Sequence, residues 1–202
     1  MGKHYETKGK KINLKKIFLF IAIILAILAL IVIINKTYKS EKDISEIINS
    51  TFTLLKDHSK EEVNKYIDYN LLITGLDDMI LEENKDEIEK ELFNNITWNV
   101  ESIEINRNKA IAIVEVSNKD YRDILTKWMK EIVNEKNKGN NISDAIALER
   151  LQTIIKEEKT MKTIIKKINL ENLEGKWNII LDNNFIELVY PGIDSVTKAL
   201  NV

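Results

Sequence analysis

The sequence predicts an α+β protein in which an N-terminal transmembrane helix precedes a domain with a curved antiparallel sheet packed on helices. Three observations carry this expectation. Residues 17–34 form an unbroken apolar run. In the chain that follows, apolar residues change from a helical period to an alternating period and back, twice. Cysteine is absent and proline occurs once, so closely spaced regular elements are expected in place of flexible linkers or disulfides.

The apolar run contains eighteen residues without a charged, polar, Gly or Pro side chain. As a helix rising about 1.5 Å per residue it would span about 27 Å, close to the hydrocarbon thickness of about 30 Å of a bilayer. A cleaved signal peptide begins similarly, but its apolar core is about 7–15 residues long and ends in a small-x-small site. The run exits into Asn35-Lys36-Thr37-Tyr38, which favours an uncleaved, single-pass anchor.

Lysines immediately before the apolar run are the expected topology signal: Lys10, Lys11, Lys15 and Lys16. By the positive-inside rule they hold the N-terminus in the cytoplasm, so we expect a cell-membrane protein with an extracytoplasmic body. The expected organisation is a basic cytoplasmic head, a transmembrane helix, a connector, an extracytoplasmic α+β domain and a tail, over residues 1–16, 17–34, 35–42, 43–193 and 194–202.

The charge is unevenly distributed. Residues 1–16 carry six lysines and one glutamate, a net charge of +5, which leaves the remainder at −7. A negative body repels nucleic acid, so no nucleic-acid partner is expected. Histidine occurs only at His4 and His58, which excludes a cluster or dyad built from several histidines. His58 is expected to be a solvated loop residue.

Three helices are expected before the sheet. Ser40-Glu41-Lys42-Asp43 resembles an N-cap, and Ser59-Lys60-Glu61-Glu62 resembles a capping box. A third helix is expected over about 77–93. Helical spacing places these apolar residues on the buried faces of the first two helices: Ile44, Ile48, Phe52, Leu55, Val63, Tyr66 and Ile67.

The period changes to two at Thr97, and residues 97–117 are predicted to form an antiparallel hairpin. Helices starting at Asp120 and after Ser143 are expected to pair as a helical hairpin inserted between strands. Strands over 161–170 and 177–181 and a short helix over 183–188 complete the domain. The predicted order is ααα-ββ-αα-ββ-α, with helices covering one face of the sheet.

Two segments carry a family resemblance. The hairpin ends in Val116-Ser117-Asn118-Lys119-Asp120, and Gly175-Lys176-Trp177-Asn178-Ile179 enters the last strand. With the element order, these segments resemble the nuclear transport factor two-like (cystatin-like) superfamily over about residues 41–193. The chain looks most like small extracytoplasmic domains of Gram-positive bacteria in that group, many of them lipoproteins or single-span proteins. It lacks a lipobox cysteine, so attachment is expected to come from the apolar run.

The resemblance implies a cone-shaped pocket between the sheet and its helices, but the fold hosts enzymes and non-enzymes alike. Aromatic side chains are the candidates for a pocket or an interface, although core packing is the favoured interpretation for them: Trp98, Trp177, Phe185 and Tyr190. The acidic residues over 77–83 alternate with other side chains and indicate a solvated face. We find no metal-ligand spacing, phosphate loop or nucleophile elbow, so no catalytic residue, cofactor or metal is expected.

Two functions remain open. The first is a non-enzymatic envelope protein, attached by one span, whose outward domain binds a protein partner, an envelope component or a small apolar ligand. The second is an assembly component of a conjugation or type IV secretion apparatus, whose inner-membrane subunits this chain resembles in its plan of head, span and outward domain. An enzyme acting on a small ligand would require a buried pocket carboxylate with a clearly raised pKa.

Overall fold

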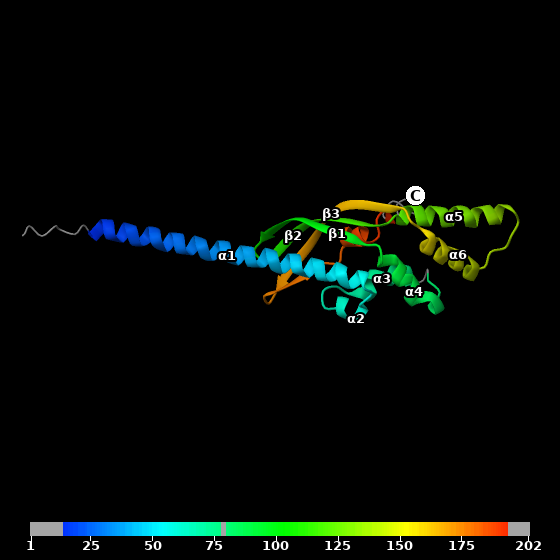
Figure 1. Cartoon of the computed structure of the whole chain (residues 1–202), viewed down its shortest axis with the longest axis horizontal. Coiled ribbons are helices and arrows are strands. Elements are labelled where there is room, and N and C mark those ends of the chain that lie inside the picture. The colour runs from blue at the N-terminus through cyan, green and yellow to red at the C-terminus, as the bar shows by residue number, and fades with distance from the viewer. Residues whose placement is uncertain (1–13, 78–79, 194–202) are drawn as a thin grey trace, which may run out of the picture. The chain divides into compact units, whose positions relative to one another are not determined.

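The computed structural model describes residues 14–77 and 80–193 (Figure 1). The chain divides into two compact units, Met1–Ser40 and Glu41–Val202. Helix α1 (Leu14–Lys56) contributes residues to both units. Of the lysines expected to set the topology, Lys10 and Lys11 lie outside the described residues, and Lys15 and Lys16 lie in the first turn of α1.

In the first unit, α1 is apolar and exposed. Residues 22–37 are all exposed, and Leu25 and Val32 have 60% and 66% of their surface accessible. Among the described residues, one helix has the length and apolar composition of a membrane span, over Ala22–Lys56, and its apolar window is not buried by protein. A helix that is apolar all round needs either a protein core or lipid around it. This feature indicates membrane association.

The helix expected to begin after Ser40 does not begin there. Helix α1 continues through residues 35–42 without interruption, so the prediction of an N-cap at Ser40 is wrong. Residues 35–42 contain neither Gly nor Pro. Without a residue that removes a backbone donor or favours a non-helical conformation, a serine followed by acidic residues is compatible with the middle of a helix as well as with its start.

The second unit has the predicted α+β fold: a curved, four-stranded antiparallel sheet packed with helices (Figure 1). The strands pair in sequence order, β1-β2-β3-β4, and a bulge between Val100 and Ser102 interrupts the register of β1 against β2. The remaining elements are β1 (Thr97–Asn106), β2 (Lys109–Lys119), β3 (Met161–Leu173), β4 (Lys176–Ile179), α2 (Lys60–Val63), α3 (Tyr69–Asp77), the 3-10 helix η1 (Glu82–Asn84), α4 (Lys85–Phe93), α5 (Tyr121–Asn137), α6 (Asp144–Glu157) and α7 (Asn183–Val189).

The core lies between the C-terminal half of α1 and one face of the sheet. The predicted face of α1 is fully buried: Ile44, Ile48, Phe52 and Leu55. The Phe52 ring stacks on Trp98 of β1 and on Phe185 of α7, with ring centroids 5.5 and 5.8 Å apart. Burial alternates along β2, because successive side chains of a strand point to opposite faces. The Phe52 ring of α1 therefore contacts both a strand, β1, and a second helix, α7.

The helical hairpin is confirmed. Helices α5 and α6 are inserted between the paired strands β2 and β3, and they extend beyond one end of the sheet (Figure 1). The indole Nε1 of Trp128 in α5 donates a hydrogen bond to the Ala147 carbonyl oxygen in α6, over 2.7 Å. The predicted face of α5 thus contacts its partner helix.

The helices between α1 and the sheet differ from the prediction. Helix α2 has four residues, and Ser59 makes no side-chain capping hydrogen bond. The range 77–93, expected to be a single helix, contains η1 and α4, and helix α3, which was not expected, ends at Asp77. The Asp68 carboxylate accepts a hydrogen bond from the Leu71 amide at 3.0 Å and so caps the start of α3.

Gly192, directly after α7 and Pro191, is expected to tolerate no side chain. Its φ is +91°, and an added Cβ would lie 2.9 Å from Arg122 Cβ and 2.9 Å from Lys162 Nζ. Gly175 has a similar φ of +88° but no atom within 4 Å of the same position. Backbone strain should lower the unfolding free energy of both Gly→Ala variants by about 1–2 kcal/mol. Crowding should lower the unfolding free energy of Gly192→Ala by about 1–3 kcal/mol more than that of Gly175→Ala.

The comparison is made by urea unfolding of the full-length chain in detergent, followed by far-UV circular dichroism. Gly175→Ala is the control for strain without crowding. Equal losses of stability in the two variants would show that the space around Gly192 adjusts to a methyl group.

Candidate functional site

The aromatic candidates lie within the packed interior of the domain. Trp177, Phe185 and Tyr190 are buried. Trp98 is half-buried, and its Nε1 donates a 2.8 Å hydrogen bond to Asn49 Oδ1. The Tyr190 ring packs edge-on against Tyr121, with centroids 5.1 Å apart. None of these four lines the two cavities described below.

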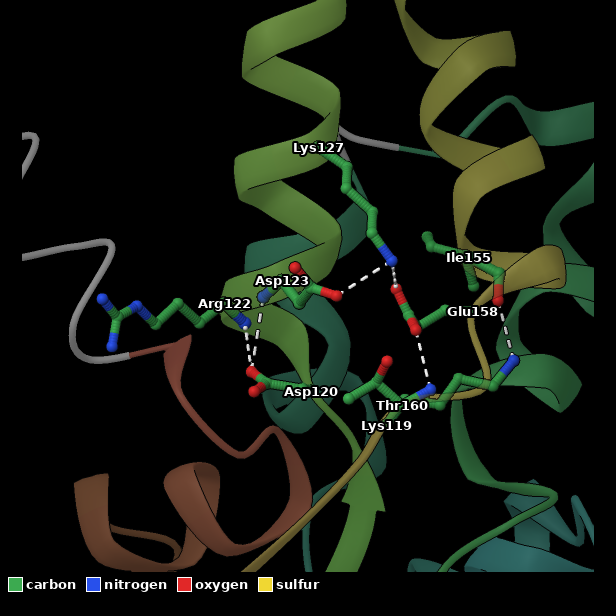
Figure 2. Close-up of polar contacts among 8 residues, drawn as sticks. All are labelled: Lys119, Asp120, Arg122, Asp123, Lys127, Ile155, Glu158 and Thr160. Atoms are coloured by element: carbon green, nitrogen blue, oxygen red, sulfur yellow. Dashed lines mark hydrogen bonds and ion pairs between the residues drawn. The ribbon is translucent and has the colours of Figure 1, made fainter.

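A polar network joins the sheet to the base of the helical hairpin (Figure 2). Lys119 ends β2, and its side chain is 1% exposed. Its Nζ donates to the Ile155 carbonyl oxygen at 2.7 Å and pairs with Glu91 Oε2 at 3.0 Å. A buried ammonium without partners costs several kcal/mol, about 3–5 when one partner is removed. This network therefore determines where α4 and α6 meet the sheet.

Both helices of the hairpin begin where the sequence predicted. Asp120 Oδ1 accepts hydrogen bonds from the amides of Arg122 and Asp123, at 3.0 and 3.3 Å (Figure 2). Ser143 Oγ accepts one from the Ile146 amide at 3.4 Å. These bonds satisfy backbone donors that a helix leaves unpaired in its first turn.

Lys127 links two carboxylates across the hairpin (Figure 2). Its Nζ lies 2.9 Å from Asp123 Oδ2 and 2.6 Å from Glu158 Oε2, at a cavity of about 280 Å³. Burial alone would raise the pKa of Glu158, but hydrogen bonds from Lys127 and from the Thr160 amide outweigh it and lower that pKa to about 2. Glu158 is thus ionised at neutral pH, the opposite of what a general acid needs.

A second polar cluster starts at the C-terminus of α1. The Ser59 amide donates to the Leu54 carbonyl oxygen (2.9 Å) and the His58 amide to that of Leu55 (3.1 Å), the pair of bonds that defines a Schellman motif. His58 has the left-handed φ of +57° at the position where Gly or Asn is usual. The chain turns here, so that His58 and Lys60 face α4.

Lys60 bridges two carboxylates of α4. Its Nζ lies 2.7 Å from Asp86 Oδ1 and 2.8 Å from Glu89 Oε2. The Asp86 side chain is 88% exposed, whereas that of Glu89 is fully buried. Glu89 Oε2 also accepts a 2.6 Å hydrogen bond from the Tyr69 hydroxyl, while Glu89 Oε1 has no hydrogen-bond partner within residues 14–77 and 80–193.

The His58 ring completes the cluster. Its two nitrogens are shielded from solvent and have no hydrogen-bond partner in the described part of the chain. Ligand atoms of His58, Asp86 and Glu89 lie within 4.8 Å of one another. His58 and Asp86 also line a cavity of about 790 Å³. Burial, followed by the charge of Lys60, lowers the pKa of His58, so the imidazole is neutral at pH 7.

This geometry corrects one expectation. His58 is not a solvated loop residue, since its ring nitrogens are buried. The expectation of no metal site was based on ligand spacing along the chain and on the scarcity of histidine, and it stays a prediction. One histidine and two carboxylates of α4 nevertheless form a set of potential ligands. The sequence contained one signal of this: Glu89 precedes Leu92 and Phe93 by three and four residues, which places it on the buried face of α4.

Comparison with known proteins does not assign this chain to a family. No family model matches the chain, and no curated protein matches it significantly. Among solved structures, it is similar to the crystal structure of "a putative lipoprotein (ycdA)" from Bacillus subtilis, with 18% sequence identity and a TM-score of 0.36. The similarity covers 64% of this chain and 45% of that chain, so this chain spans less than half of that protein. A likeness at this TM-score assigns neither a family nor an activity.

The Lys127–Glu158 pair should make stability depend on acid pH. The pKa of Glu158 is 4.5 in a model peptide and about 2 in the folded protein, so the unfolded chain binds the proton more readily. Its contribution to the unfolding free energy is therefore complete above about pH 5 and is lost as the pH falls to about 2. Glu158→Gln should be less stable at pH 7 and lose less stability between pH 5 and pH 2.

Urea midpoints of the full-length chain in detergent, measured from pH 7 to pH 2, test this dependence. Exposed Glu157 gives the matched control, Glu157→Gln, which should keep the wild-type slope. The same slope in Glu158→Gln as in the wild type would contradict the assignment.

Proposed function

We propose that this protein is a non-enzymatic, single-pass membrane protein whose extracytoplasmic α+β domain binds a protein partner, an envelope component or a small ligand. The observation that carries the proposal is the change in burial along α1. Leu25 and Val32 are exposed on a helix that is apolar all round, whereas Ile44 and Ile48 of the same helix are fully buried in the domain core. A lipid bilayer is the environment that would stabilise the exposed apolar segment of α1.

The charge pattern supports the orientation. Residues 1–16 contain six lysines and one glutamate, and an excess of lysine before a first span favours retention of that end in the cytoplasm. The body is net negative, which would not oppose its transfer. The polar exit at Asn35-Lys36 supports an anchor that is not cleaved.

We further infer that the domain belongs to the nuclear transport factor two-like (cystatin-like) superfamily. The order of helices and strands supports this inference, as does a curved antiparallel sheet whose strands pair in sequence order. The helical hairpin between β2 and β3 also agrees with it. Since such folds host many functions, membership would not by itself identify the ligand.

The pairing of ionisable side chains supports a binding role over proton transfer. At the two cavities, Lys60 pairs with Asp86 and Glu89, and Lys127 pairs with Glu158. A catalytic carboxylic acid needs a pKa raised towards neutrality, whereas the pKa of Asp86 is lowered, first by the hydrogen bond from Lys60, and that of Glu158 is lowered to about 2.

Leu25→Arg should weaken membrane retention, because an arginine at the centre of a span costs about 2.5–3.5 kcal/mol on insertion scales. The control is Leu71→Arg, which puts the same change on a leucine of α3 that is 55% exposed and should stay in the membrane fraction. Carbonate extraction of membranes and immunoblotting measure the retained share. Full retention of Leu25→Arg would argue against this segment as the anchor.

Because the chain contains no cysteine, single cysteines report its topology directly. Asn141→Cys, at an exposed position between α5 and α6, should react with a membrane-impermeant maleimide on intact cells. Thr7→Cys should react only after the cells are lysed. The reverse pattern would invert the topology, and release of a protein without the Thr7→Cys thiol would identify a cleaved signal sequence.

Co-purification from detergent-solubilised envelope then tests the binding role. A specific partner recovered with the tagged full-length chain but not from cells without it would identify what the protein binds. Recovery of conjugation or type IV secretion subunits would instead favour the role of an assembly component.

A further inference from the structure

We propose that His58, Asp86 and Glu89 bind a divalent transition-metal cation, which exchanges with the ammonium group of Lys60. This inference goes beyond the proposed function, because it assigns a ligand class to a defined site in the domain and does not depend on the anchor or its orientation.

The donor set fits such an ion. One imidazole nitrogen and two carboxylate oxygens are typical ligands of Zn²⁺ and Mn²⁺, whereas Mg²⁺ and Ca²⁺ prefer oxygen alone. The ligand atoms lie within 4.8 Å of one another. Ligands bound at about 2.1 Å in a tetrahedron are about 3.4 Å apart, so small side-chain rotations would complete the geometry.

Three buried atoms of this cluster have no hydrogen-bond partner among the described residues. Glu89 is fully buried, its Oε1 has no hydrogen-bond partner in the described residues, and neither does either ring nitrogen of His58. Buried polar atoms are almost always paired, and an exception calls for a reason such as an ion. A metal bound between His58 and Glu89 would satisfy one atom of each side chain.

Lys60 explains how the site is neutralised without metal. Its Nζ contacts both carboxylates, at 2.7 and 2.8 Å, and so holds a positive charge where the cation would bind. A lysine side chain is flexible and its ammonium is a compact charge. The Lys60 ammonium can therefore move away from Asp86 and Glu89 towards Glu61 and Glu62, which also line the cavity. Asp86, which is 88% exposed, lies at the open side, where an ion would enter.

The backbone brings these ligands together. The Schellman motif at the end of α1 turns the chain at His58, and Asp86 and Glu89 are three residues apart on one face of α4. His58 holds a left-handed φ of +57°, where histidine is less favourable than glycine. A strained residue of this kind is consistent with a functional role.

The cluster at the hairpin base provides a matched control. Lys127 bridges Asp123 and Glu158 at 2.9 and 2.6 Å, as Lys60 bridges Asp86 and Glu89, but the described residues place no imidazole there. Removing either lysine frees two carboxylates, so only the first removal should create a site with a nitrogen ligand.

The test uses the full-length chain in detergent, without a histidine tag and with His4→Gln, so that His58 is the only imidazole. Isothermal titration with Zn²⁺ and with Mn²⁺ at pH 7, together with thermal melting, is expected to show one equivalent bound and a raised Tm. Lys60→Met should bind several-fold more tightly, because the competing ammonium is gone. Glu89→Gln should lose at least about tenfold in affinity.

His58→Asn separates ligand loss from misfolding, since asparagine adopts the left-handed region readily. Its Tm without metal should stay close to that of the parent, while binding falls at least about tenfold. Equal binding by the parent and His58→Asn would overturn the proposal. So would unchanged affinity in Lys60→Met, or a gain in Lys127→Met equal to that in Lys60→Met, which would show that any freed carboxylate pair suffices.

Discussion

Two consecutive buried polar side chains at the end of β2 hold the helices of this domain against its sheet. The Asn118 amide donates to the carbonyl oxygens of Leu92 and Val189, at 3.0 and 2.8 Å, which connects β2 to α4 and α7. The neighbouring Lys119 ammonium connects β2 to α4 and α6. Leaving such groups buried and unpaired costs more than a hydrogen bond ordinarily contributes. The positions of three helices therefore depend on bonds that a shift of any one of them would break.

Helix α4 connects these buried hydrogen bonds to the polar cavity that His58 and Lys60 line. Its C-terminal end is bound to β2 through Leu92, and one turn earlier Glu89 lies fully buried against Lys60 and Tyr69. Because the first contact holds the helix in place, the second places a buried carboxylate where His58 enters from α1. The cluster that we propose as a cation site is thus a product of the same packing that forms the core.

Helix α1 combines two physical environments in one element. Its first part exposes apolar side chains on all sides, and its last turns bury one face, from Ile44 to Leu55, against the sheet. The Schellman motif that ends this helix also turns the chain at His58. An exposed apolar segment, a core face and one side of the polar cavity therefore belong to a single continuous helix.

The sequence by itself determined the features that depend on near neighbours: the apolar run, the buried face of α1, the strand hairpin and the caps at Asp120 and Ser143. Period and capping act within a few residues, so they can be read without a fold. The prediction from sequence was wrong where the same residues are compatible with two local structures, as at Ser40. Only the tertiary structure decided the polar clusters, since His58 and Glu89 are distant in sequence and are brought together by the packing of α1 and α4.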